Sequence, residues 1–434
     1  MNASRRDVLK MAGVALAGSA LPTIAIINPN RAYAGVNSDT LKIGLIGCGG
    51  RGSGAANQAL KSDPNVVLHA MGDIFKDKLD SSFENLTKVH GAKVKVDEGH
   101  KFVGFDAFKK VLDSGVDVVL LATPPHFRPE HLTAAINAGK HVFCEKPVAV
   151  DAPGVRKVLD AAKLAKQKNL SLMSGFCWRY HEPKRASFGK ILDGAVGDIS
   201  AVYNTYDTGT LWSFPRVQGW TDAQYVLRNW TYYTWLAGDH IVEQAVHSID
   251  MMSWAMGGKL PISAVGTGGR QVRTEELFGN IFDHFAVTYE YENGAKGFHH
   301  SRQQANCENS YLVETIGTKG RAMVNCARNV HEIYGQNPWK YEGKQNDMYQ
   351  TEHDELFASI RKGKPLNDGE FMAHSTLLAI MGRMAAYTGK RVTWEDAMNS
   401  TEKLGPQNLS SADFSFDMKP PIVEVARPGI TSFS

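Results

Sequence analysis

Two short stretches of the sequence combine residue types that can move protons. The first is Glu145-Lys146-Pro147, which directly follows HVFC, an apolar run of strand length. A lysine at the mouth of a buried strand is costly unless it meets a partner or a substrate, although its apolar stem can also carry the charge out to solvent. An ammonium group in such a place suits proton transfer to or from a reacting hydroxyl. Lys146 is therefore a candidate acid–base residue.

The second stretch is AGDHIVEQAVHSIDMMSWAMG, in which apolar residues recur at helical spacing. Glu243 and His247 are four residues apart and Asp250 follows three later, so one continuous helix would place all three on one face. A carboxylate and an imidazole placed in this way can orient and charge-tune each other. A buried polar stripe that anchors the helix is the alternative. The stretch lacks the H-E-x-x-H pattern and a third ligand, so we expect no metal.

A glycine-rich loop between a strand and a helix could hold a redox cofactor beside these groups. The apolar run 41–46 precedes it, and the helical stretch 53–60 follows. In this context the first glycine permits a tight turn, the second lets the backbone approach a pyrophosphate, and the third allows close helix–strand packing. The predicted cofactor contacts in the loop are Gly47, Cys48, Gly49, Gly50, Arg51 and Gly52.

Asp73 indicates which nucleotide this loop would bind. It ends the next strand, VVLHAMGD, 21 residues after Gly52. A carboxylate there can accept hydrogen bonds from both ribose hydroxyls and would repel a 2′-phosphate. We therefore predict NAD rather than NADP; a glycine turn with an unrelated solvated aspartate is the alternative.

Strands and helices alternate through the first half of the chain. Helical stretches at 105–113, 129–139 and 152–168 separate the strands VDVVLLAT, HVFCEKP and LSLMSGFCWRY. This alternation predicts a parallel sheet wound on both faces, which binds ligands beyond the carboxyl ends of its strands. The residues at those ends that we expect to contact the cofactor are Thr123, Pro124, His126, Glu145, Lys146, Trp178 and Arg179.

Aromatic residues are concentrated between the two proton-handling stretches, at 212–235. Aromatic faces can stack on the CH surfaces of sugars, and charged neighbours can bond sugar hydroxyls. The predicted substrate contacts are Arg228, Trp230, Tyr232, Trp235, Asp239 and His240. A partly buried loop core or a subunit interface explains the same composition equally well.

Taken together, these motifs resemble the Gfo/Idh/MocA family, named after glucose–fructose oxidoreductase and inositol dehydrogenase. The resemblance extends from Leu41 to about Trp394, and its segments are IGLIGCGGRG, ATPPHFRPEH, CEKP, GFCWRYHEP, EQAVHSID and IGTKGRA. It implies that Lys146 and His247 are the proton-handling pair and that Asp250 lies in the substrate pocket.

The resemblance also implies a fold and an assembly. The fold is α/β, a Rossmann-type doubly wound parallel sheet, followed by an α+β domain with a large, mostly antiparallel open sheet. Such sheets often pair, so we expect a homodimer or homotetramer. One departure matters: Glu243 stands where the family usually has aspartate, and Ala245 replaces a glycine. We therefore expect this pocket to hold its substrate differently.

The N-terminus predicts export of a folded protein. SRRDVLK, the apolar segment 11–27 and the small residues Ala32-Tyr33-Ala34 are typical of a twin-arginine signal cleaved after Ala34. An uncleaved anchor or a cytoplasmic chain is the alternative. Because dinucleotides are not freely available outside the cytoplasm, an exported enzyme of this kind must carry its NAD with it, and we predict a periplasmic location without stable membrane insertion after cleavage.

The predicted domains follow from these signals. They are a signal peptide at 1–34, an NAD-binding domain at 35–177, a substrate and oligomerisation domain at 178–370, and at 371–434 a C-terminal helix that packs back on the NAD-binding domain, followed by a tail.

Composition excludes several classes of function. Cleavage removes four of 48 basic and one of 45 acidic residues, which leaves a formally neutral chain. Such a chain has no electrostatic footprint for nucleic acid. The five cysteines are odd in number and lack a CxxC pair, which argues against a disulfide framework.

We predict an oxidoreductase that transfers hydride between tightly bound NAD and a sugar, glycoside or polyol. The alternatives are an NAD-dependent glycosidase and a non-catalytic sugar-binding protein.

Overall fold

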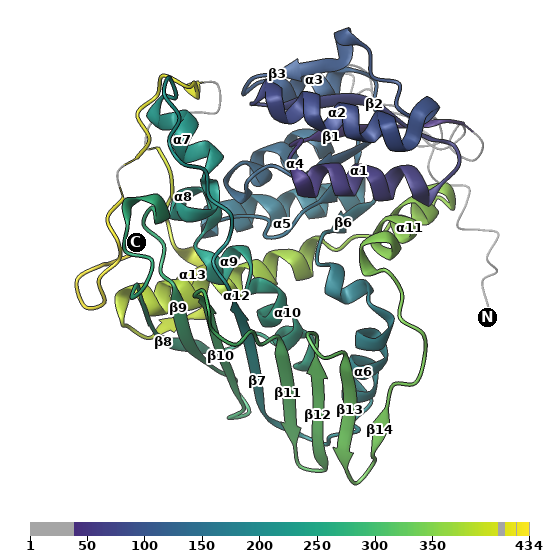
Figure 1. Ribbon diagram of the computed structural model, residues 1–434. Coiled ribbons are helices and arrows are strands. Elements are labelled where there is room, and N and C mark those ends of the chain that lie inside the picture. The colour runs from purple at the N-terminus through teal and green to yellow at the C-terminus, as the bar shows by residue number, and fades with distance from the viewer. Residues whose placement is uncertain (1–38, 407–412, 422, 434) are drawn as a thin grey trace, which may run out of the picture.

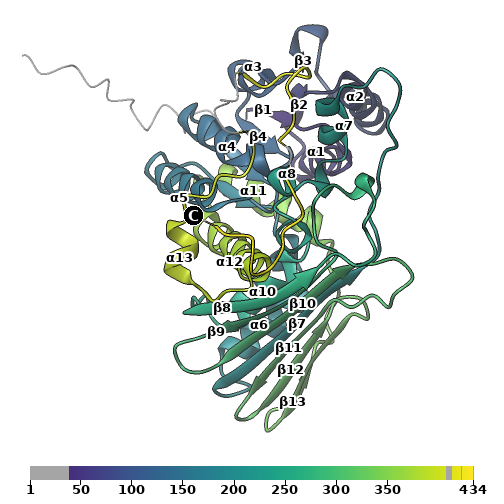
Figure 2. The ribbon, with the colours of Figure 1, turned by 90° about the vertical axis from the view of Figure 1, so that its left-hand side faces the viewer.

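The computed structural model describes residues 39–406, 413–421 and 423–433, which form two β-sheets and the helices around them (Figure 1). The predicted signal peptide, 1–34, lies outside the described residues. The two sheets lie at opposite ends of the molecule, and helices fill the space between them (Figures 1 and 2).

The first sheet is parallel throughout, as predicted, with the strand order β3-β2-β1-β4-β5-β6. Its strands are β1 (Leu41–Ile46), β2 (Val66–Asp73), β3 (Lys101–Val103), β4 (Val118–Leu121), β5 (His141–Cys144) and β6 (Leu172–Ser174). One face is covered by α1 (Gly50–Ser62), α2 (Lys76–His90) and α11 (Met348–Arg361), and the other by α3 (Ala107–Asp113), α4 (Arg128–Asn137) and α5 (Ala152–Gln167). Helices on both faces explain why these strands are apolar without alternation.

The second sheet is open and mostly antiparallel, as predicted. Its order is β14-β13-β12-β11-β7-β10-β9-β8-β15, and only β10 and β7 run parallel. The strands are β7 (Ile199–Thr208), β8 (Ser263–Gly269), β9 (His284–Glu290), β10 (Lys296–Gln303), β11 (Leu312–Gly317), β12 (Gly320–Asn325), β13 (Val330–Gly335), β14 (Trp339–Lys340) and β15 (Val392–Thr393). Buried and accessible residues alternate along β9 and β10, because one face packs on helices and the other does not.

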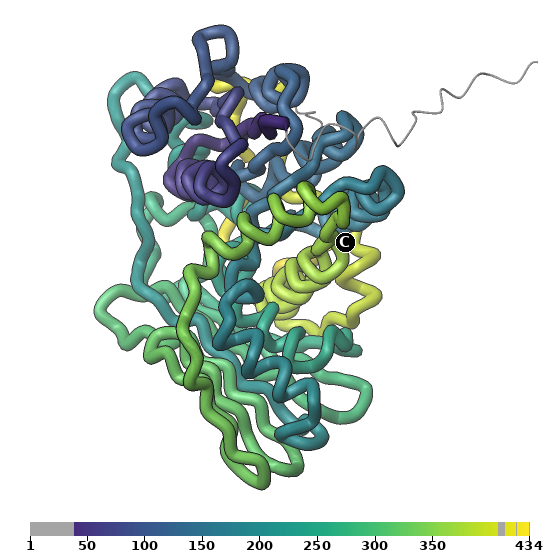
Figure 3. The backbone as a smooth tube through the Cα atoms, turned by 90° about the vertical axis from the view of Figure 1, so that its right-hand side faces the viewer, coloured from purple at the N-terminus to yellow at the C-terminus, as the bar shows by residue number. Residues whose placement is uncertain are grey.

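Three helices cover the packed face of this sheet: α6 (Glu182–Leu192), α10 (Val246–Ala255) and α12 (Gly369–Thr388). α12 also packs against α5 of the first sheet, and Arg383 on it donates a hydrogen bond to the carbonyl of Val150 at 2.7 Å. Figure 3 shows α11 and α12 following each other between the two sheets. α12 therefore ties the NAD-binding half to the second half.

Four short helices complete the described part: α7 (Asp222–Arg228), α8 (Thr234–Ala237), α9 (His240–Glu243) and α13 (Trp394–Asn399). None of the helices in the described ranges is long and apolar enough to cross a bilayer.

Two sequence predictions are wrong in detail. The strand expected to run through GFCWRY ends at Ser174, and residues Cys177–Tyr180 form a 3₁₀ turn instead. The helix expected to carry Glu243, His247 and Asp250 on one face is two helices: α9 ends at Glu243, and α10 begins at Val246.

Candidate active site and cofactor cleft

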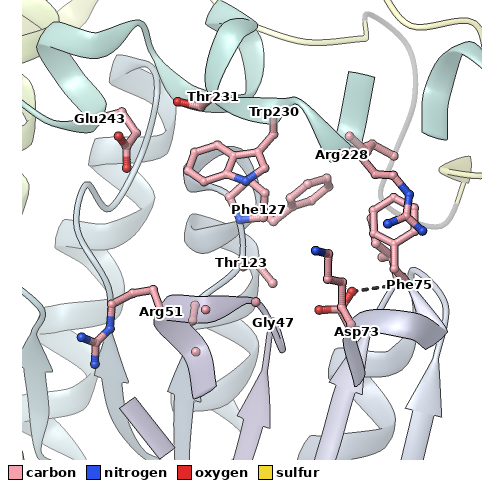
Figure 4. A pocket seen from close by; sticks show the side chains of 18 of the residues that line it. Gly47, Arg51, Asp73, Phe75, Thr123, Phe127, Arg228, Trp230, Thr231 and Glu243 are labelled. Carbon is pink, nitrogen blue, oxygen red and sulfur yellow. Dashed lines mark hydrogen bonds between the residues drawn. The ribbon is translucent and has the colours of Figure 1, made fainter. Parts of the chain in front are cut away.

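A cleft of about 520 Å³ lies at the carboxyl ends of the parallel strands (Figure 4). Its floor is the glycine loop, residues 73–75 after β2 and residues 122–124 after β4. Its roof comes from far along the chain: residues 211–214, residues 227–231 and Phe414. Glu243 and Gln244 close one end.

The glycine loop is shaped for a phosphate group. Gly47 has φ +95°, which an L side chain rarely adopts. A Cβ on Gly52 would lie 1.9 Å from the carbonyl oxygen of Gly47, so the helix can approach the strand only with glycine there. A Cβ on Gly49 would meet no atom within 4 Å, so this backbone is open to the cleft at the N-terminus of α1. The loop therefore leaves room for a pyrophosphate beside free backbone N–H groups.

Asp73 is the last residue of β2, at the carboxyl end of the strand, and it lines the cleft. Its Oδ2 accepts the N–H of Cys48 at 2.7 Å and its Oδ1 accepts the N–H of Phe75 at 2.8 Å. Burial raises the pKa of this carboxyl above its usual range. Each oxygen keeps a second lone pair, so both can still accept from ribose hydroxyls. The loop and Asp73 together fit an NAD molecule.

Arg51 and Glu145 form an ion pair at the inner side of the glycine loop. Their closest atoms, Nε and Oε1, are 2.9 Å apart, and the Arg51 guanidinium lies 4.9 Å from the ring centre of Tyr349. Glu145 is buried, whereas about a third of the Arg51 side chain remains accessible. The ion pair places the Arg51 guanidinium at the wall of the cleft and holds Glu145, the residue before Lys146, in position.

Lys146 reaches across the molecule to the end of α9. Its Nζ donates to the carbonyl oxygen of Glu243 at 2.6 Å and lies 3.6 Å from the Glu243 carboxylate. The contact is possible because the helix is interrupted there: the N–H of His247 bonds the carbonyl of Gln244, so that of Glu243 is left for Lys146. The interruption therefore joins Lys146 to Glu243, and of the two only Glu243 lines the cleft.

His247 is buried beside this pair. Its ring stacks on Trp178 with centroids 4.9 Å apart, and its Nδ1 has no hydrogen-bond partner. Burial lowers its pKa well below the usual range, and the charges of Lys146 and Lys184 lower it further. His247 is therefore held as a neutral imidazole.

Asp250 and Arg179 have roles different from those expected. Asp250 accepts a bidentate pair of hydrogen bonds from Arg179, at 2.9 Å from both Nε and Nη2, and a further bond from Ser375 at 2.6 Å. The Arg179 guanidinium lies 4.2 Å from the Phe371 ring centre. Asp250 is 1% exposed and does not line the cleft. The pair joins the 3₁₀ turn to α10 and α12, which indicates a structural role.

The predicted sugar contacts separate into two groups. Arg228 and Trp230 line the cleft, whereas Tyr232, Trp235, Asp239 and His240 are buried and do not. Their bonds are internal: the Tyr232 hydroxyl donates to the carbonyl of Leu211, the Asp239 carboxylate accepts the N–H groups of His240 and Phe282, and His240 lies between Phe282 and Ser301. The structure places these four in a packed loop core and not in the lining of the cleft.

The remaining predicted cofactor contacts also divide. Thr123 and Pro124 line the cleft. His126 does not: it packs edge-on against Trp235 at 5.1 Å, and burial lowers its pKa to about 4. Trp178 forms a wall between His247 and Tyr206, on which it also stacks. His126 therefore packs against Trp235, and Trp178 holds the ring of His247, without either residue lining the cleft.

Several site residues were missed from the sequence. Gln244 lines the cleft and accepts a hydrogen bond from Gln303 at 2.8 Å. Its place next to Glu243 was a usable signal. Tyr206 and Tyr311, 4.9 Å apart beside Trp178, gave none, because their strands are far apart in the chain. Within the described ranges, no group of three or more histidine, cysteine or acidic residues is placed to hold a metal ion.

Comparison with known proteins shows which family has this fold and this cofactor loop. Residues 41–176 match the model of the oxidoreductase family with an NAD-binding Rossmann fold, and residues 190–323 match the GFO/IDH/MocA C-terminal domain. The chain belongs to the Gfo/Idh/MocA family. It is therefore an NAD-binding oxidoreductase-family protein, and the resemblance predicted from its motifs is confirmed.

Individual members of the Gfo/Idh/MocA family are distant. A myo-inositol 2-dehydrogenase of Thermotoga maritima is 23% identical over 75% of this chain and 90% of its own. A glycosyl hydrolase family 109 protein of Shewanella pealeana is 29% identical over 46% of each chain, so some curated relatives match over less than half their length. The structure of GenD2 from gentamicin A biosynthesis, in complex with NAD, aligns with a TM-score of 0.63 at 18% identity, covering 88% of this chain and 99% of that one.

Proposed function

We propose that the protein transfers hydride between a tightly held NAD and a hydroxyl-bearing carbon of a sugar, glycoside or polyol. The observation that carries this proposal is the contact between Lys146 and Glu243, which lines the end of the cofactor cleft, with a neutral His247 buried close behind them. Sugar and polyol dehydrogenases among the relatives support the substrate class.

Each side chain then has a defined part in the reaction. When bound, NAD takes up or returns the hydride. His247, which burial and two nearby ammonium groups keep neutral, offers an unprotonated ring nitrogen to the hydroxyl proton. Lys146 uses one N–H on the carbonyl of Glu243 and can direct another to the substrate oxygen. Glu243 holds that ammonium in place, and its carboxylate at the end of the cleft can accept a second substrate hydroxyl.

A redox-neutral glycosidase is the second candidate, supported by the glycosyl hydrolase family 109 relative. Oxidation at C3 of a glycoside would acidify the C2–H, a base would remove that proton, and the aglycone would leave from C1 with the bonding electrons. Water would then add across the double bond, and the hydride would return to C3. Atoms and electrons balance, and no external acceptor is needed.

One experiment separates the two reactions. Purified protein is incubated with glycosides carrying deuterium at C3, and products are identified by mass spectrometry. A dehydrogenase yields the keto-sugar, with deuterium on the cofactor when C3 is the carbon that is oxidised. The redox-neutral route yields free aglycone and a sugar that retains the label. A panel in which neither product forms would contradict both and leave a binding protein. His247→Ala serves as the inactive control.

Location and assembly are further parts of the proposal. We infer export to the periplasm by the twin-arginine route, supported by Arg5, Arg6 and the small residues before position 35.

We also infer a homodimer or homotetramer formed through the open face of the second sheet, where Val265 and Phe298 are 38% and 41% exposed. Sedimentation velocity of the wild type and of Phe298→Glu tests the assembly.

A further inference from the structure

The roof of the cofactor cleft is built from two segments that lie nearly 200 residues apart in sequence. The first is the segment 209–231, which includes α7. The second is the tail 413–418, which returns from the C-terminal end of the chain. Figures 1 and 2 show the tail, in yellow, passing beside α7 and α8 and next to the first sheet. Here the two segments together are called the latch.

Hydrogen bonds within the latch hold its two segments together. The side chain of Asn229 accepts the N–H of Phe214 at 2.8 Å and donates to its carbonyl at 3.1 Å, which holds the segment 209–221 against the end of α7. The Thr221 hydroxyl caps α7 and donates to the carbonyl of Phe416 at 2.6 Å, which joins the two segments. The latch is therefore one bonded unit.

Three sets of contacts fasten the latch to the NAD-binding half. Arg228 forms a bidentate ion pair with Asp77 at 2.7 and 3.0 Å. Its guanidinium also lies 4.0 Å from the ring centre of Phe75, and Figure 4 shows these two side chains next to each other. Lys78 lies 5.0 Å from the ring of Phe214.

The third set is aromatic and comes from the tail. Phe416 stacks on Phe75 with centroids 5.3 Å apart, and Phe414 packs against Phe105 and Phe127 at 5.9 and 5.6 Å. Phe75 and Phe127 follow Asp73 and Thr123 closely in the chain, and all four line the cleft. Because a carboxylate at the position of Asp73 binds the adenosine ribose of NAD, this side of the cleft is where the adenosine half would fit. Phe414 itself lines the cleft.

We propose that this latch, closed by Phe414 and Phe416, binds over the adenosine half of NAD and keeps the cofactor in the protein between turnovers. An aromatic roof adds stacking surface to a dinucleotide that the Rossmann floor alone would leave open to solvent. Separation of the tail contacts and of the Arg228–Asp77 pair would uncover the bound NAD, so we expect the latch to act mainly on the dissociation rate. The inference rests on the NAD-binding fold and not on the sugar chemistry.

Isotope exchange tests the latch without any substrate. The purified, NAD-loaded protein is mixed with excess ¹³C-labelled NAD, samples are separated from free nucleotide, and the labelled fraction is measured by mass spectrometry after denaturation. We expect the double variant Phe414→Ala/Phe416→Ala to exchange at least about tenfold faster than the wild type, because each lost ring contact weakens the closed state. Phe433→Ala is the matched control, since this tail phenylalanine packs on the main core instead.

Two results would overturn the latch: equal exchange rates in the double variant and in Phe433→Ala, or a wild type that exchanges as fast as the double variant. The milder pair Phe414→Leu/Phe416→Leu, with unfolding midpoints measured alongside, shows whether faster exchange follows the lost rings or a damaged fold. Slow exchange in a protein with no sugar activity would leave the latch standing and refute the proposed function.

Discussion

Removing the carboxylate of Asp250 should damage the fold far more than the chemistry. Asp250 is 1% exposed, and its Arg179 partner is 18% exposed at the side chain, so solvent screens the pair little. Asp250→Ala would leave a buried guanidinium without its anion and Ser375 without its acceptor. Breaking a buried pair in this way typically costs ~3–5 kcal/mol. For a chain of about 400 residues we expect the melting temperature to fall by roughly 4–6 °C.

The assay is thermal and chemical unfolding of the NAD-loaded protein, with turnover measured well below the transition. Arg179→Met/Asp250→Leu removes both charges, so it should recover much of the lost stability. If Asp250 instead bonds the substrate, Asp250→Asn would melt like the wild type and lose turnover by more than about 100-fold. That result would refute the structural reading of the pair.

Three more outcomes are expected. Asp73→Ser should weaken NAD binding and relax the preference against NADP, as titrations of refolded apoprotein would show; natively bound NADP would contradict it. His131 and His353 are buried and neutral, and burial lowers the pKa of each to about 3, whereas the same side chains in the unfolded chain have a pKa near 6.5. Below about pH 6.5 the unfolded chain therefore binds more protons, and the free energy of unfolding, measured by urea titration, should fall by roughly 1 kcal/mol per pH unit for each histidine. Changing Arg5 and Arg6 to lysine should leave a folded, NAD-loaded precursor in the cytoplasm, and fractionation that still finds it in the periplasm would show the signal was misread.

The Rossmann half was predictable because its signals are local. The strand, the turn at Gly47 and the helix after it occupy consecutive residues, and the acidic residue that ends β2 follows at the expected spacing. The alternation of apolar strands and helices is likewise visible within short windows.

The break between α9 and α10 was not predictable, because distant residues stabilise it. Apolar periodicity continues through Ala245, but Gln303 bonds Gln244, and Lys146 takes the carbonyl of Glu243. These partners lie 59 and 97 residues away in sequence. A window of helical spacing contains neither.

The sugar contacts among the aromatic residues at 212–235 were also not predictable, because distant residues decide which of them are buried. Composition alone does not tell a sugar platform from a packed core. Tyr232 and Trp235 are core because Leu211, His126 and Phe414 meet them in three dimensions. The tail that supplies Phe414 carried no motif at all.

The central claim is tested most directly by the near-ultraviolet absorbance of the protein-bound cofactor after rapid mixing with the substrate. Both proposed reactions begin with hydride transfer, so the wild type should show reduced nicotinamide, at least transiently. Lys146→Ala and His247→Ala should each slow its appearance ~10²–10⁴-fold while bound NAD is retained, and the two losses should not add, because both residues serve one proton transfer. Near-native reduction rates in both variants, with cofactor present, would contradict the account.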